Sequence, residues 1–247
     1  MSSELRKYFM IGTSVLIFSI FVLFSTFVIV GGLKEIKKVE KTVTVTGSAK
    51  KQIKSDLVIW RSGFSSQEAE LSTAYVRLNE SLTKVKEYLV KKGLEESDLT
   101  VLPISTSTNY IINPNGVSTN KIESYTLRQE IEVRSKEVEK ITEISRRATD
   151  LINNGINFQS YAPQYIYTQI GGVKVDMLAQ ATQDAKSRAE QISQNAGSKL
   201  KGLKTAKMGV FQITPLYSTD VSDYGIYDTS SIEKEITGIV NCVFTVE

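Results

Sequence analysis

The chain has 247 residues, with 30 Lys and Arg against 27 Asp and Glu, and it contains no histidine. Such a near-balance of charge argues against a nucleic-acid partner, whose binding surface is normally visibly basic. The lack of histidine excludes Ser-His-Asp and Cys-His catalysis, and a single cysteine leaves no plausible zinc site. We therefore expect a non-enzymatic protein without catalytic residues, cofactor or metal.

The N-terminal segment differs from the rest of the chain. Residues 8–33 carry no charged side chain and are mostly Ile, Val, Leu and Phe. A helix of that length rises ~39 Å, more than the ~30 Å hydrocarbon core of a bilayer requires. A cleaved signal peptide is the alternative, but its apolar region is usually only ~7–15 residues long. We predict a retained transmembrane anchor over 8–33, preceded by a flank at 1–7 and followed by a juxtamembrane linker at 34–41.

The flanking charges do not fix the side of the membrane. Arg6 and Lys7 precede the apolar run and four lysines follow it within the linker, which favours a cytoplasmic domain. Long domains, however, can cross the membrane largely regardless of such charges. The lone Cys242 cannot form an intramolecular disulfide, so it gives no information on the compartment either.

The folded part is predicted to begin with two strands and a helix. Residues 42–46 alternate polar and apolar side chains, and 56–64 reads as the partner strand across an exposed turn with Lys50, Lys51 and Lys54. Ser65-x-x-Glu68 matches a capping box and predicts a helix start at that point. The helix has an apolar stripe at spacings of three and four and ends at Gly93; the stripe consists of Leu71, Tyr75, Leu78, Leu82, Val85 and Leu89.

A hairpin and a second helix are expected next. Strands at 99–110 and 125–134 flank a turn at 113–116. In the second strand the polar positions, which should face water, are Arg128, Glu130, Glu132 and Arg134. The second helix has Val138, Ile141, Ile144, Ala148 and Leu151 on its buried face and ends at Asn153-Asn154-Gly155.

The order of strand, helix, glycine and strand occurs twice, around Gly93 and around Gly155. An internal duplication into two strand-helix-strand subdomains and a chance resemblance both explain it. A strand at 158–168 then leads to a third helix from Gly171 to Gly197. Its predicted buried face is Val175, Leu178, Thr182, Ala185, Ala189, Ile192 and Ala196.

Strands at 204–214 and 237–246 complete the chain, with a loop at 215–235 between them. Helices and hairpins alternate along the sequence. The predicted fold is therefore α+β, a mixed and mostly antiparallel sheet with three helices packed against it, preceded by one transmembrane helix.

Two stretches resemble the SIMPL domain of bacterial proteins. Val43-Thr44-Val45-Thr46-Gly47-Ser48-Ala49, with Asp56 opening the next strand, is similar to the family's V-x-V-x-G-x-(G/A) start. Ala179-x-Ala181-x3-Ala185-x3-Ala189 with Gly197-x-x-Leu200 resembles its Ala/Lys-rich helix. With the closing strand, the resemblance covers roughly residues 40 to 247. The chain departs from the family pattern at Ser55, where a proline is usual, and at Lys201-Gly202, both in predicted turns.

The resemblance implies an exported or envelope-associated protein with no agreed enzymatic activity. It further implies a family whose members often self-assemble and are sometimes linked to stress defence. On this basis we expect a single-pass protein of the cell membrane with its C-terminal domain outside the cytoplasm.

Few side chains are candidates for a site. Tyr217, Tyr224 and Tyr227 lie in the last loop and are expected to form an interaction loop, because tyrosine is favoured at interfaces. Asp220, Asp223 and Asp228 lie beside them but lack the EF-hand register, which favours a solvated acidic loop over a calcium site. Cys242, within the last strand, is expected to be a buried hydrophobe.

The sequence favours a membrane-anchored envelope domain that binds a partner or forms a homo-oligomer. It would contact the lipid bilayer through residues 8–33. A hydrolase or transferase that uses carboxylates such as Asp56 or Asp176 is the alternative, since two acids with different pKa values can act without histidine.

Overall fold

The structure is a computed structural model that describes residues 12–13, 16, 18–29 and 40–247. Residues 18–29 are helical. The predicted flank at 1–7, much of the predicted anchor at 8–33 and the linker up to residue 39 lie outside the described residues. Over the part of the chain that is described, no helix combines the length and hydropathy needed to cross a membrane.

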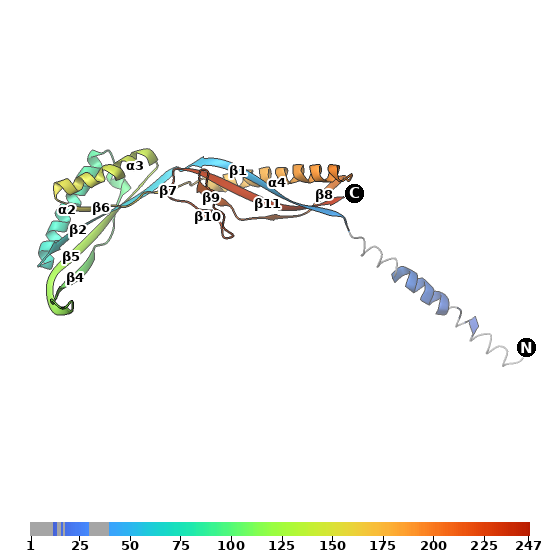
Figure 1. Cartoon of the computed structure of the whole chain (residues 1–247), viewed down its shortest axis with the longest axis horizontal. Helices are drawn as coiled ribbons and strands as arrows, with labels where there is room; N and C mark the ends of the chain where they lie inside the picture. The colour runs from blue at the N-terminus through green and yellow to red at the C-terminus, as the bar shows by residue number, and fades with distance from the viewer. Residues whose placement is uncertain (1–11, 14–15, 17, 30–39) are drawn as a thin grey trace, which may run out of the picture. The chain divides into compact units, whose positions relative to one another are not determined.

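The remainder of the chain has the predicted α+β organisation (Figure 1). Its helices are α2 (Leu71–Lys91), α3 (Val138–Arg147) and α4 (Ile170–Asn195), with short 3-10 helices η1 (Glu96–Asp98) and η2 (Ala148–Asn154). Its strands are β1 (Thr42–Lys54), β2 (Leu57–Glu68), β3 (Leu99–Val101), β4 (Ser105–Ile112), β5 (Ser118–Ser135), β6 (Asn157–Ser160), β7 (Gln164–Ile166), β8 (Leu200–Met208), β9 (Gln212–Pro215), β10 (Ile226–Tyr227) and β11 (Glu233–Val246). Counted over the described residues, residues 18–29 make a fourth helix beside the three predicted to pack on strands.

The strands form two sheets rather than the single one expected. The five-stranded sheet has the order β1-β11-β9-β10, with β8 also on β11, and the six-stranded sheet has the order β3-β5-β2-β6, with β4 on β5 and β7 on β2. The β9–β10 pair is parallel, whereas β2 and β5 pair antiparallel over eleven positions from Val58↔Ser135 to Glu68↔Tyr125. Mostly antiparallel pairing was predicted and is confirmed.

The chain divides into two compact units. One contains Val45–Arg188 and Ala206–Cys242, and the other contains Ala189–Thr205, Val243–Glu247 and the described residues before Val45. The surfaces described below as candidate sites all lie in the first unit, which also holds the main core.

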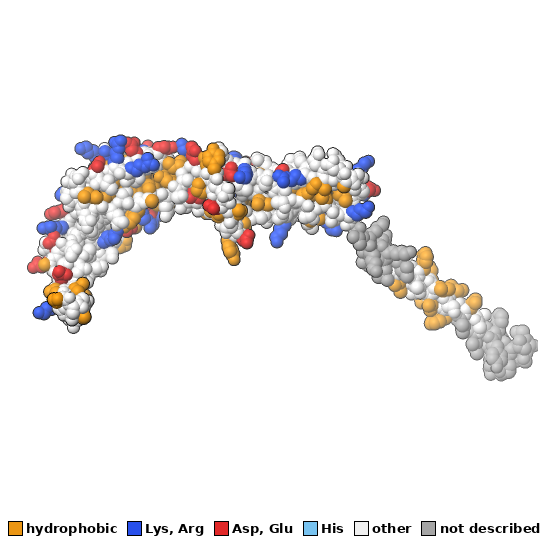
Figure 2. All heavy atoms as spheres, in the orientation of Figure 1, with side chains coloured by type: hydrophobic (Ala, Val, Ile, Leu, Met, Phe, Trp, Pro, Cys, Tyr) orange, Lys and Arg blue, Asp and Glu red, His pale blue; other side chains and the backbone are white. Residues whose placement is uncertain are grey.

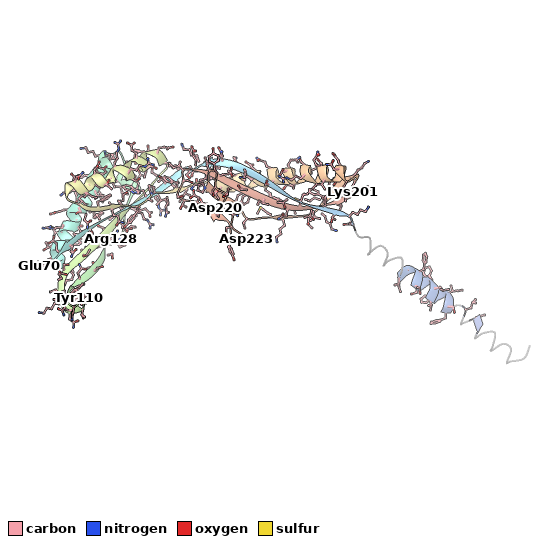
Figure 3. All side chains as sticks on the ribbon, viewed as in Figure 1. Glu70, Tyr110, Arg128, Lys201, Asp220 and Asp223 are labelled. Carbon is pink, nitrogen blue, oxygen red and sulfur yellow. The ribbon has the colours of Figure 1, made fainter. Side chains whose placement is uncertain are left out.

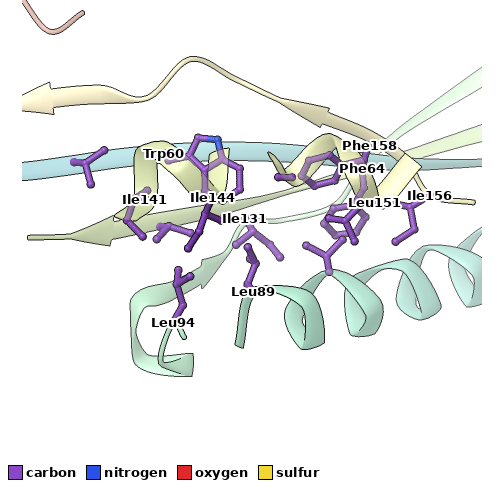
Figure 4. Packing of buried hydrophobic residues seen from close by; sticks show 14 of the residues in the cluster. Trp60, Phe64, Leu89, Leu94, Ile131, Ile141, Ile144, Leu151, Ile156 and Phe158 are labelled. Atoms are coloured by element: carbon purple, nitrogen blue, oxygen red, sulfur yellow. The ribbon is translucent and has the colours of Figure 1, made fainter. Parts of the chain in front are cut away.

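The main core lies between the six-stranded sheet and the helices α2 and α3, which cover one of its faces (Figures 1 and 4). Alternate positions of β2 and β5 point to this face, as in a half-buried strand, and most of them are apolar: Val58, Trp60, Phe64, Leu127, Ile131 and Val133. Its largest fully buried side chains include Trp60, Phe64, Leu78, Leu89, Ile131 and Ile141. Burying each such side chain stabilises the fold by ~1.5–3 kcal/mol.

The glycine that ends each predicted helical segment was identified correctly, although the segment before Gly155 is the 3-10 helix η2. Gly93, Gly155 and Gly197 all have positive φ, and the residue after each donates to the carbonyl five positions earlier, as in Leu94 N to Leu89 O at 3.2 Å. Glycine is favoured there because left-handed backbone carries no Cβ penalty. The turn at 113–116 is also confirmed, with Gly116 N donating to Asn113 O at 2.8 Å.

The predicted capping box is wrong. Glu68 is still part of β2 and pairs with Tyr125, and its carboxylate lies 2.8 Å from Arg77. The helix starts at Leu71, and no side chain caps it. Residues 65–68 pair with β5 in the sheet, so their backbone is extended and cannot form the first turn of a helix.

The predicted end of the first strand at Gly47 is also wrong, because β1 continues to Lys54. A Cβ on Gly47 would lie 2.5 Å from Ala185 N and 2.7 Å from Ala185 Cβ, and closer still to the Ala181 carbonyl. Gly47 therefore marks the place where α4 approaches β1, not a turn. Lys50 and Lys54 are strand residues that pair with Glu235 at 2.7 Å and Glu139 at 2.5 Å.

Three predicted strands are interrupted. The strand at 99–110 divides into β3 and β4 near Pro103, the strand at 158–168 divides into β6 and β7 near Pro163, and the strand at 204–214 is broken between β8 and β9. Proline lacks the N–H that a ladder needs, which explains the first two breaks. The second predicted helix is shorter than expected, because α3 ends at Arg147 and η2 follows.

The buried face of α4 differs from the prediction. Ala185 and Ala189 are buried as expected, but Val175, Leu178 and Ile192 are exposed. The face is completed instead by Val173, Met177 and Ala181. Small residues lie there because β1 passes close at Gly47.

Candidate interaction surface

The last loop is held at its base by a buried ion pair. The Lys234 side chain is 1% exposed and the Asp228 side chain 9%, and Lys234 Nζ lies 3.1 Å from Asp228 Oδ2. Asp228 also accepts hydrogen bonds from the backbone N–H and hydroxyl groups of Ser230 and Ser231. Burial alone would raise the pKa of Asp228, but these hydrogen bonds and Lys234 outweigh it and hold that pKa well below its usual range. Burial lowers the pKa of Lys234, and Asp228 offsets part of that effect.

The loop itself, residues 216–225, is braced by its backbone and is called the interaction loop below. Gln212 Nε2 donates to the Ser222 carbonyl at 2.7 Å, Ser218 N to Pro215 O, and Gly225 N to Ser222 O. On its C-terminal side, β10 pairs with β9 through Ile226↔Gln212. The loop therefore projects from a hydrogen-bonded frame, so ordering it in a complex requires little further loss of entropy.

The interaction loop presents apolar side chains to water. Tyr217 is 88% exposed, Tyr224 97% and Val221 74%. Figure 2 shows hydrophobic side chains projecting from this part of the surface, and Figure 3 labels the neighbouring Asp220 and Asp223. Tyr217 also has a φ of 64°, which is uncommon for a residue other than glycine.

The three predicted tyrosines do not form one equal set. Tyr217 and Tyr224 lie in the exposed part of the loop, whereas Tyr227 lies in β10, is half-exposed and donates its hydroxyl to Tyr167 O at 3.4 Å. Val221 was not predicted, because a single valine in a polar stretch carries no periodic signal. The Asp228–Lys234 pair was not predicted either, since five residues, four of them irregular, separate its members.

An apolar groove lies at the start of α2. It has a volume of about 900 Å³ and is lined by Leu71 and Tyr75 of α2, by Ile104 and by Tyr125 and Leu127 of β5. Leu71 and Tyr75 are about half-exposed despite their place in the predicted apolar stripe. The polar part of the lining consists of Glu70, which is labelled in Figure 3, with Ser72 and Thr106. This groove is called the α2 groove below.

The other face of the six-stranded sheet is polar. A cleft of about 370 Å³ opens there beside Arg61, Glu130 and Tyr161. The Arg128 guanidinium donates to the Tyr161 hydroxyl and, at 2.6 Å, to Gln159 Oε1. Within the cleft itself, the Tyr161 hydroxyl donates to Glu130 Oε1 at 3.2 Å.

Glu132 lies on that polar face, but the prediction that it faces water is wrong. Its side chain is buried, because Arg61 and Arg134 lie over it and bind its two oxygens at 2.6 Å each. Burial alone would raise the pKa of Glu132, but the two guanidinium groups outweigh it and lower that pKa.

The acids named for the alternative enzymatic hypothesis, Asp56 and Asp176, lie just before β2 and on α4. Both oxygens of Asp56 accept hydrogen bonds from Thr168, from its N–H at 2.8 Å and its hydroxyl at 2.9 Å. Asp176 is an exposed residue of α4. Cys242 is fully buried as predicted, and burial raises the pKa of its thiol. Within the described ranges, no three His, Cys, Asp or Glu side chains lie close enough together to hold a metal ion.

Comparison with known proteins gives one family. The SIMPL model, described as a protein of unknown function (DUF541), matches residues 43–228. The match runs from β1 to the interaction loop and β10, and it agrees with the resemblance seen in the sequence. No curated protein matches the chain.

Proposed function

We propose that this chain, which belongs to the SIMPL family, is a membrane-anchored envelope domain that acts by binding rather than catalysis and self-assembles through its interaction loop. The proposal includes an extracytoplasmic domain held to the bilayer by residues 8–33. A link to stress defence follows from the family resemblance alone and belongs to the same proposal.

One observation carries the assembly proposal. Tyr217, Val221 and Tyr224 hold three large apolar side chains almost fully in water on a loop whose base is a buried ion pair. Exposed apolar side chains scattered singly need no explanation, but three within one loop of ten residues can be covered by a single partner. Burying each stabilises a complex by ~1.5–3 kcal/mol before the entropy of association is subtracted. Tyrosine is also enriched among the residues that dominate interface energies.

The membrane part of the proposal rests on the uncharged run at 8–33. Phe18→Arg with Val22→Arg would place two charges near the middle of a span, at ~2.5–3.5 kcal/mol each. Wild-type chain should resist alkaline-carbonate extraction and the double variant should not. Recovery of shortened wild-type chain in the soluble fraction would show a cleaved signal peptide instead.

The assembly proposal is tested by mass. Full-length chain in detergent should give a light-scattering mass, after subtraction of detergent, of at least twice its 27.5 kDa. The loop variant Tyr217→Ser, Val221→Ser, Tyr224→Ser should move to the monomer mass. Val90→Ser with Ile152→Ser removes two other exposed apolar side chains and serves as the control that should remain oligomeric. A wild-type chain that stays monomeric up to high micromolar concentration would refute self-assembly.

A further inference from the structure

We infer that the interaction loop of one copy docks in the α2 groove of the next, with an aspartate of the loop at the N-terminus of α2. The inference rests on the proposed self-assembly and names the partner of the same loop. Its two halves are an apolar match and a charge match.

The apolar match lies between two surfaces that both leave large side chains in water. The loop offers Tyr217, Val221 and Tyr224, and the α2 groove offers Leu71 and Tyr75 above a floor that includes Leu127. The groove of about 900 Å³ is shallow and largely open to solvent, so side chains of a docked loop can enter it from outside. Aromatic rings that pack against other rings add to the gain from buried area, and Tyr75 and Tyr125 provide such rings.

The charge match lies in the polar part of the groove lining, at the start of α2. The helix α2 has 21 residues, no side-chain cap and no acidic residue in its first turn. Its first helical hydrogen bond is from Ala74 N to Glu70 O, so the N–H groups of the three residues before Ala74 have no helical acceptor. A carboxylate placed there satisfies these donors and the positive end of the helix dipole.

The interaction loop carries two carboxylates. Asp220 accepts a hydrogen bond from the Ser218 hydroxyl through Oδ2, at 2.9 Å. Asp223 is exposed beside Tyr224. A loop that inserts a tyrosine into the groove therefore brings an acid close to the start of α2. Glu70 opposes this contact, because its carboxylate lines the groove without capping the helix.

The loop and the groove share no residue, so the contact is heterologous. One copy's loop fills the next copy's groove and leaves a loop and a groove unused at the two ends. Such contacts extend head to tail until they close into a ring or continue as a filament.

Cysteine cross-linking of the full chain in isolated membranes tests the pairing. Chains with Tyr224→Cys and chains with Tyr75→Cys are co-expressed, with a different tag on each, and oxidised with copper phenanthroline. Cys242 is fully buried and should contribute no background. We expect a reducible dimer that carries both tags. Tyr224→Cys with Ile152→Cys, an exposed position of η2 that is not part of the groove lining, is the matched control and should give little dimer.

A chain with both Tyr75→Cys and Tyr224→Cys should give a ladder of dimers, trimers and longer species, because each copy carries both halves of the contact. Adding Glu70→Gln should raise the association constant about two- to fivefold by removing a like charge. Dimer formed equally with the Ile152→Cys control, or a Glu70→Gln change that weakens the cross-link, would overturn the inference.

A lysine-reactive cross-linker on the wild-type chain separates the two proposals. Wild-type dimers without a Tyr224–Tyr75 cross-link would leave self-assembly intact and refute the groove as the docking site. The absence of any wild-type dimer would refute self-assembly itself.

Discussion

Asp228 and Lys234 set the stability of the loop base. The ammonium group of Lys234 donates to both the carboxylate and the backbone carbonyl of Asp228, at 3.1 and 2.5 Å. The same short segment is tied to its surroundings by Tyr165 N to Thr229 O and Ser55 N to Ile232 O, both near 2.9 Å. A buried charge without its partner is strongly destabilising, so the pair should be asymmetric to mutation.

Asp228→Ala should reduce the free energy of unfolding by about 3–5 kcal/mol, because it leaves the Lys234 ammonium group buried and unpaired. Lys234→Met should reduce it by only about 1–3 kcal/mol, since Asp228 keeps its four hydrogen bonds to Ser230 and Ser231. Urea unfolding of both variants measures the difference. A larger loss for Lys234→Met than for Asp228→Ala would contradict this account of the pair.

Glu132 gives the polar sheet face a dependence on pH. Its pKa is lowered in the folded chain, because the hydrogen bonds from Arg61 and Arg134 outweigh the effect of burial. A group with a depressed folded pKa stabilises the fold above its unfolded value, ~4.3 for Glu, and loses that contribution as the pH falls through the folded value.

Glu132→Gln should therefore be less stable than the wild-type chain near pH 6, and the difference should shrink as the pH is lowered toward 3. Urea unfolding at several pH values measures it. Arg128→Gln, which leaves the Glu132 pair intact, should not change the pH slope in this way. If the difference in free energy of unfolding between Glu132→Gln and the wild-type chain increased as the pH was lowered, Glu132 would not be held in its ionised form.

At the scale of elements, the contact between β1 and α4 depends on Gly47. The Cβ of any other residue would overlap backbone atoms of α4 at Ala181 and Ala185. Next to it, Ser48 N donates to Asp184 Oδ2 at 2.8 Å. This hydrogen bond helps to set the position of α4 along β1. Figure 1 shows α4 running beside β1 and β11.

Gly47→Ala should destabilise the chain by about 1–3 kcal/mol or more, since rigid backbone and not a flexible side chain must move. Gly202→Ala in β8 is the control, because a Cβ there meets no heavy atom within 4 Å. It should be neutral or slightly stabilising. Thermal unfolding of the two variants measures the difference, and equal melting temperatures would show that β1 and α4 are less tightly packed than described.

How far sequence predicts these elements depends on the range of the interactions involved. The glycine helix stops were predictable because their hydrogen bonds reach only five residues back. The prediction of a capping box at Ser65 was wrong because this residue pairs instead with β5, about 60 residues later in the chain. Glu132 was expected in water because alternation does not reveal two arginines folding over it. The candidate site was predictable only in part. The tyrosines of the loop were identified from the sequence, but no local pattern indicated the buried Asp228–Lys234 ion pair at its base or the α2 groove.

At the scale of the whole chain, the exposed strand β8 is the alternative to the interaction loop as an assembly surface, and its side chains argue against it. The strand β8 is exposed along nearly its whole length and pairs only with β11 among the described strands. It carries Lys201, Lys204 and Lys207, and lysines on an edge strand discourage pairing with another sheet. Two of them are also engaged, with Glu247 at 2.8 Å and Glu40 at 2.7 Å. The interaction loop has no such protection.

The most direct test of assembly counts copies in a membrane. Full-length chain with one fluorophore per copy is reconstituted at low density in a lipid bilayer, and the photobleaching steps of each spot are counted. Wild-type spots should bleach in two or more steps. Spots of the Tyr217→Ser, Val221→Ser, Tyr224→Ser variant should bleach in one. Single-step bleaching of the wild-type chain at every density would contradict a protein that assembles through its interaction loop.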